Sequence, residues 1–183
     1  MILFSIIITD DTFCKKDEVC FTKDEILKIF NTYKTTNKIE MPIFNEFYSN
    51  YLVKFKSFEN LLNTTKSIFR LDSRLGIALY GMLCFEMKSL DWTEHNELLT
   101  GELSDLFYFN RDDFINGFAF EHDQEFISSI IEHIGVPVDV SQKLGYDSRK
   151  VKNELLNYLD KHSLIKQYNI QKLIEWIKEG NYF

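Results

Sequence analysis

The sequence predicts a mainly α protein, a compact bundle of about seven or eight helices around one buried central helix. Hydrophobic residues make up 45% of the 183 residues and aromatic residues 15%, which is enough to fill a core. Two prolines and seven glycines leave few breaks in the helical patterns. Along most of the chain, apolar residues recur at the three- and four-residue spacing of an amphipathic helix.

The N-terminal segment is the one part with strand character. The β-branched run Ile2–Ile8 ends at a Thr-Asp-Asp turn and predicts a short strand, with residues 18–21 as the nearby partner for a hairpin. Thr22 and Glu25 have capping-box spacing, so a helix is expected from residue 22 to about residue 34. Pro42 suits the first position of another helix. An aromatic stripe at helical spacing follows it: Phe44, Phe47, Tyr48, Tyr51, Leu52 and Phe55.

The central helix is predicted from residue 73 to residue 88, after a helix from 57 to 69. Asp72 can cap it, and its residues are apolar on nearly every side, which is typical of a helix buried all round. Gly76 and Gly81 each cost roughly 1 kcal/mol in helix propensity. We therefore expect neighbouring helices to pack closely against the bare backbone at both glycines.

The following segment predicts two helices joined by a connection at 110–113. The first runs from Thr93 to Phe109, and the second is capped by Asp123 and stops at Gly135. In the first of these helices, five apolar residues are expected to face inward: Leu98, Leu99, Leu103, Leu106 and Phe107.

An extended linker is predicted at residues 136–140. Helices follow from Ser148 to about His162 and from Asn169 to Glu179. We expect one helical domain over residues 1–183, with a subdomain boundary near 136–147.

Charge is the most unevenly distributed property of the chain. The segment from Glu86 to Glu132 has twelve acids and two bases and carries −10, whereas the whole chain carries −7, so the other residues sum to +3. Acidity argues against nucleic acids and anionic membranes as partners, because both are themselves negative. Solubility alone would explain mild acidity, but its concentration in one segment favours binding to a cation or a basic protein.

The sequence has no signature of a nucleotide-binding loop, a serine hydrolase or a zinc protease. His122 and Glu125 could share a helical face as metal ligands, although a surface ion pair is the commoner arrangement. Asp112 and Asp113 would need convergent geometry to act as an acid–base pair. We expect no catalytic residue, no metal, no cofactor and no enzymatic activity.

The cysteines indicate a reducing compartment. Cys14, Cys20 and Cys84 are odd in number and lack C-x-x-C spacing, so they are expected to be free thiols, with Cys84 an inert core thiol. The apolar start lacks the basic region and cleavage site of a signal peptide, and it is too short to span a bilayer. We predict a cytoplasmic protein with no membrane partner.

A nucleic-acid-binding regulator is the alternative function. The C-terminal section Ser141–Phe183 has eight bases and five acids, and its two successive helices have the general order of a helix-turn-helix. However, no glycine turn precedes the second helix, and its polar face mixes both charges, which favours an ordinary solvated surface.

In size, acidity, residue usage and lack of catalytic motifs, the chain resembles the immunity proteins of bacterial polymorphic toxins and of contact-dependent growth-inhibition systems. The resemblance implies a cytoplasmic inhibitor that binds and neutralises a cognate protein toxin, which is basic and often a nuclease. Concentrated carboxylates would steer such a partner and occupy its substrate groove. The expected contact residues are Asp105, Asp112, Asp113, Glu121, Asp123 and Glu125.

Overall fold

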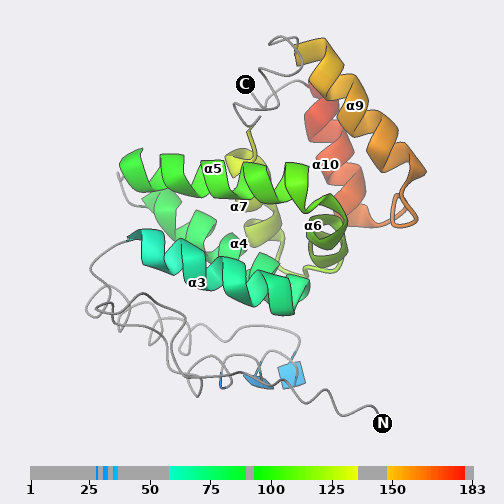
Figure 1. The fold of residues 1–183 in the computed structure, drawn as a ribbon. Coiled ribbons are helices and arrows are strands. Elements are labelled where there is room, and N and C mark those ends of the chain that lie inside the picture. Colours follow the sequence, from blue (N-terminus) through cyan, green and yellow to red (C-terminus); the bar gives the residue numbers. More distant parts are fainter. Residues whose placement is uncertain are drawn as a thin grey trace. The chain divides into compact units, whose positions relative to one another are not determined.

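The computed structural model describes residues 58–89, 93–135 and 148–179, together with residues 28, 31, 32, 35 and 36. This part of the chain contains seven helices and no strand, which confirms the mainly α class (Figure 1). The helices are α3 (Phe58–Leu71), α4 (Ser73–Ser89), α5 (Thr93–Phe109), α6 (Arg111–Phe118), α7 (Gln124–His133), α9 (Ser148–Lys161) and α10 (Tyr168–Glu179).

The chain divides into two compact units, residues 1–64 and residues 65–183. In the first unit, the five single described residues are helical and lie within or just after the helix expected from 22 to 34. The expected N-terminal strand, the hairpin, the helix after Pro42 and the linker at 136–140 lie outside the described residues. The single domain with a boundary near 136–147 stays a prediction.

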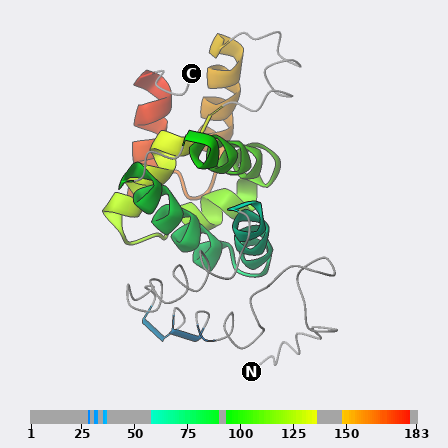
Figure 2. The same ribbon diagram turned by 90° about the vertical axis from the view of Figure 1, so that its left-hand side faces the viewer.

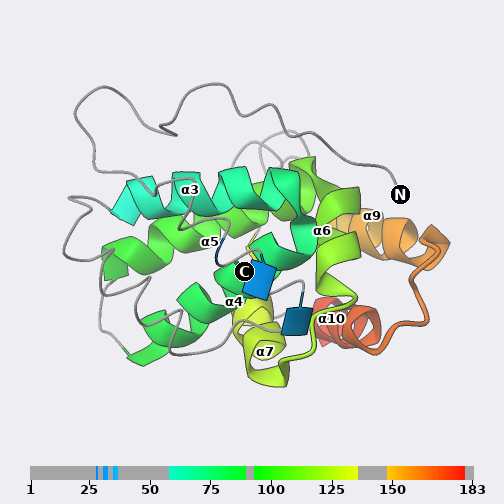
Figure 3. The same cartoon turned by 90° about the horizontal axis from the view of Figure 1, so that it is seen from below.

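Helix α4 is the centre of the second unit. It packs against α6 and α7 most extensively, and also against α5 (Figures 1 and 3). Every residue from Leu75 to Cys84 is buried, as expected for a helix that is apolar on all sides. The prediction of a buried central helix is therefore confirmed.

The glycines of α4 lie where neighbouring helices come closest. A Cβ atom at Gly81 would sit 2.5 Å from the Cβ of Phe126 in α7, and one at Gly76 would overlap the backbone of Phe69 in α3. Gly117 of α6 has the same role, because its Cβ would overlap the carbonyl group of Ser73. The predicted close packing at Gly76 and Gly81 is confirmed.

Two predicted helix caps are present. The carboxylate of Asp72 accepts hydrogen bonds from the backbone N–H groups of Arg74 and Leu75 at 3.1 and 3.2 Å. The carboxylate of Asp123 accepts from Glu125 and Phe126 at 2.9 and 3.3 Å. Each satisfies amides that the first turn of a helix leaves without a partner.

The connection predicted at residues 110–113 is wrong, because α6 begins at Arg111 and only Asn110 separates it from α5. The N–H of Phe114 already donates to the carbonyl of Asn110 at 2.9 Å. Phe114 and Phe118, one helical turn apart, are fully buried and bind α6 to the core. Asp112 and Asp113, which suggested a loop, stand in the first turn, where they offset the helix dipole.

Two further expectations are wrong. Leu98 was expected to face inward, but it is 43% exposed, because the buried side of α5 is centred on Leu99, Leu103 and Leu106. Asn169 was expected to open the last helix, but α10 begins at Tyr168 and the Asn169 side chain is buried.

The two C-terminal helices form a pair that also touches the core. Helices α9 and α10 pack against one another, and α10 contacts α6 and α7 (Figure 2). Val151, Leu155 and Leu159 of α9 are buried, as are Ile170 and Leu173 of α10. The positions of both helices agree closely with the sequence prediction.

The glycines allow a matched test of packing. Replacing Gly81 by Ala should lower the free energy of unfolding by about 1–3 kcal/mol, because the new methyl group has to displace Phe126. Replacing Gly101 by Ala should raise it by up to about 1 kcal/mol, because a Cβ there meets nothing within 4 Å. Urea denaturation of both variants checks this, and equal effects would contradict the close packing of α4.

Candidate functional site

The acidic segment runs through α5, α6, the turn at residues 119–123 and α7. The side chains of Glu86, Asp91 and Glu94 lie outside the described part of the structure. The six predicted contact residues fall into three groups. Asp105 is on α5, Asp112 and Asp113 are in the first turn of α6, and Glu121, Asp123 and Glu125 surround the start of α7.

Glu121 and Asp123 build the turn that leads into α7. The Glu121 carboxylate accepts hydrogen bonds from the N–H groups of His122 and Asp123 at 2.7 and 2.9 Å, and Asp123 is the helix cap. Burial raises the pKa of Glu121, although the two backbone hydrogen bonds favour its charged form. Both carboxylates therefore have structural roles.

Asn169 anchors this turn from α10. Its buried amide nitrogen donates to the carbonyls of Phe118 and Glu121 at 2.9 and 2.8 Å, and the carbonyl of Ala119 is 3.3 Å away. One side chain thus satisfies carbonyls that follow the end of α6. The sequence held a signal for the burial of Asn169, since it is four residues before the buried Leu173 and so shares its face, but none for its carbonyl partners.

Asp112 links α6 to α9. Its carboxylate accepts a hydrogen bond from the Tyr158 hydroxyl at 2.5 Å, and the Nε2 atom of His162 is 3.8 Å away. Burial, and then the hydrogen bond and charge of Asp112, raise the pKa of Tyr158 above its ordinary value of 10.0. Arg111 lies over the Tyr158 ring, 4.7 Å from its centroid, and 3.6 Å from Glu154. The Asp112 side chain is nevertheless 80% exposed, so its contacts with Tyr158 and His162 leave the carboxylate accessible to solvent.

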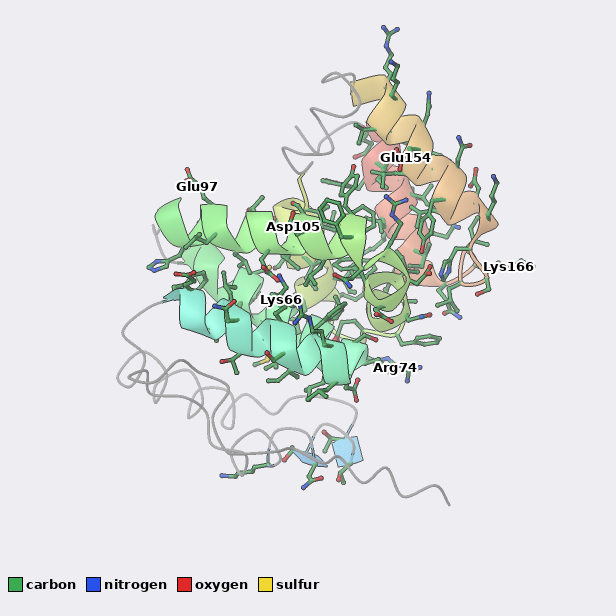
Figure 4. The ribbon with its side chains drawn as sticks, viewed as in Figure 1. Lys66, Arg74, Glu97, Asp105, Glu154 and Lys166 are labelled. Atoms are coloured by element: carbon green, nitrogen blue, oxygen red, sulfur yellow. The ribbon has the colours of Figure 1, made fainter. Side chains whose placement is uncertain are left out.

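Asp105, Asp113 and Glu125 are the carboxylates directed to solvent. All three residues are exposed, and within the described residues their side chains make no hydrogen bond or ion pair. Figure 4 labels Asp105 and Glu97 along α5. Because no base within the described chain neutralises these three carboxylates, they contribute to the negative field outside the protein.

A polar cluster that the sequence did not indicate joins α3, α4 and α5. The Lys66 ammonium lies 2.9 and 3.1 Å from the two carboxylate oxygens of Glu102, and the buried Tyr80 hydroxyl donates to Glu102 at 3.4 Å. Burial raises the pKa of Tyr80 well above 10.0, so it remains a neutral donor. Of the acids on α5, Glu102 is therefore committed to the core.

The described residues include no group of three or more His, Cys, Asp or Glu side chains placed to hold a metal ion. His122 is exposed within the turn at residues 119–123. Cys84 is completely buried in α4, which agrees with the expected core thiol.

Comparisons with protein-family models, with curated proteins and with solved structures found no match for this chain. Among the described helices, none combines the length and the apolar composition needed to cross a bilayer.

Replacing Asn169 by Ala should lower the free energy of unfolding by about 1–3 kcal/mol, because the carbonyls of Ala119 and Glu121 lose their side-chain donor. The matched control is Gln171→Ala, which removes an exposed amide that donates to the Ile165 carbonyl. That variant should change stability by no more than about 0.5 kcal/mol. Urea denaturation measures both, and equal losses would show that Asn169 has no special role.

Glu121→Gln should raise the melting temperature at neutral pH. The amide oxygen can still accept both backbone hydrogen bonds, while the variant avoids burying a charge. A raised pKa means that the folded state holds the proton more tightly. Wild-type stability from this group therefore falls as pH rises from the ordinary 4.5 through the folded-state pKa. The advantage of the variant should shrink toward zero as pH falls to about 4.5, and a constant advantage in calorimetry would contradict this.

Proposed function

We propose that the protein is a cytoplasmic inhibitor that binds and neutralises a cognate basic protein toxin through the acidic surface of α5, α6 and α7. The observation that carries this proposal is the exposure of Asp105, Asp113 and Glu125 without a neutralising side chain in the described structure. They belong to a segment that carries −10. Such a field attracts a positive surface and accelerates association.

The packing of the helices that hold these acids supports the same proposal. Asp113 stands in the first turn of α6, whose core residues are fully buried, and Glu125 stands in the first turn of the capped helix α7. Asn169 holds the turn between these helices. A pre-organised surface loses less conformational entropy when a partner binds.

The decisive experiment is affinity purification of the tagged protein together with the product of the gene immediately upstream. A stable stoichiometric complex with a basic toxin domain, whose activity stops on binding, would support the inhibitor. Retention of DNA in place of that protein would favour the regulator that uses the C-terminal helices, with binding that weakens steeply as salt increases.

The double variant Asp105→Lys/Asp113→Lys should slow association with the toxin domain about tenfold or more at low salt. Its fold should persist because both side chains are exposed. Stopped-flow or surface-binding kinetics over a range of salt concentrations would measure the change. Asp112→Lys is less suitable, because it also breaks the hydrogen bond from Tyr158.

The double variant Asp160→Lys/Glu175→Lys is the matched control, since both residues are exposed acids, on α9 and α10, and the change of net charge is the same. It should alter the association rate much less than Asp105→Lys/Asp113→Lys. An association rate that depends neither on the salt concentration nor on the double substitution Asp105→Lys/Asp113→Lys would rule out an acidic interface.

A further inference from the structure

The outer face of α5 combines exposed apolar side chains with acids. We use this name for its five exposed residues, Glu97, Leu98, Gly101, Asp105 and Phe109. Leu98 is 43% exposed and Phe109 is 61% exposed, so this face presents two large apolar side chains to solvent next to its acids. Figure 4 labels Glu97 and Asp105 on this helix.

Helix geometry brings four of these residues into one stripe. Leu98, Gly101, Asp105 and Phe109 follow one another at steps of three, four and four residues. They therefore fall within an arc of about 80° over a length of about 16 Å. A Cβ at Gly101 would meet nothing within 4 Å, so packing inside the chain does not require glycine there. The bare backbone at the middle of the stripe allows a partner to approach closely.

The charge around the stripe identifies the chemistry of its partner. Between Thr93 and Phe118 the sequence has six acids, of which Glu102 is paired with Lys66, and its single base, Arg111, faces Glu154 at 3.6 Å. The last turn of α5 has no basic residue to offset the negative end of the helix dipole. A partner for this face therefore presents Lys or Arg, whose apolar stems can cover Leu98 and whose cationic groups can lie over the Phe109 ring.

We infer that the outer face of α5 is the surface on which the basic toxin docks, with Phe109 as the main anchor and Leu98 as the second. This inference rests on the proposed function and narrows it to one helix. Exposed acids set the rate of association, whereas the apolar anchors set the lifetime of the complex. Glu121 and Asp123, which build the turn before α7, are then outside the main contact.

The test uses a catalytically inactivated form of the toxin domain encoded immediately upstream. Phe109→Ala should accelerate dissociation about tenfold or more, and Leu98→Ala should accelerate it less, with nearly unchanged association. Two matched controls remove equally exposed side chains elsewhere: Tyr168→Ala, from a residue 64% exposed, and Leu71→Ala, from one 52% exposed. Both controls should keep the wild-type dissociation rate within about twofold.

Gly101→Gln provides a second variant that does not depend on removing an apolar group. Its side chain points into open space, so it should fold normally and still block close approach, which should weaken binding about tenfold or more. Thermal denaturation of every variant confirms that it is folded.

The possible outcomes are separable. If the wild-type protein binds the toxin domain and the complexes of Phe109→Ala, Leu98→Ala and Gly101→Gln have the same lifetime as the wild-type complex, this inference is overturned. The inhibitor proposal then still stands. Failure of the wild-type protein to bind the toxin domain would overturn both. A dimer of the free protein that Phe109→Ala dissociates in sedimentation would show that a second copy occupies the face, which also overturns the inference.

Discussion

The structure depends on the close approach of neighbouring helices to α4. Because Gly81 lacks a Cβ, Phe126 can bring α7 almost onto the α4 backbone, and Gly117 lets α6 do the same beside Ser73. Interiors packed at this density transmit small changes in volume. The acidic surface is carried by the helices that pack on α4, so its geometry is fixed from inside the protein.

The carboxylates of the acidic segment have different structural roles, although they carry the same charge. Asp123 and Glu121 satisfy backbone amides, and Glu102 binds Lys66 beside the buried Tyr80. These carboxylates therefore stabilise the local structure through hydrogen bonds and an ion pair. Asp105, with no side-chain partner in the described structure, is the kind of carboxylate that leaves a field outside the molecule. Net charge alone cannot separate these two kinds.

The sequence predicted the features that local physics determines. The bounds of α5, the Asp72 and Asp123 caps and the burial of α4 follow from spacing, side-chain chemistry and glycine propensity. The sequence-based prediction was wrong at α6. Only Asn110 separates this helix from α5, and the two acids in its first turn, Asp112 and Asp113, suggested a loop. The prediction also failed at Asn169, because its carbonyl partners lie about fifty positions earlier and no local pattern encodes such a pairing.

The Asn169 anchor also has a consequence for the order in which the protein matures on the ribosome. The carbonyl of Glu121 receives the Asn169 amide from 48 residues further along the chain. At typical synthesis rates that interval is about 3–10 s. The helices around α4 contain their own caps and glycine contacts and can assemble during this time. The turn at residues 119–123 acquires its hydrogen bonds from Asn169 only afterwards. A nascent chain without α10 would therefore present Glu121 and Asp123 on a turn that lacks these bonds.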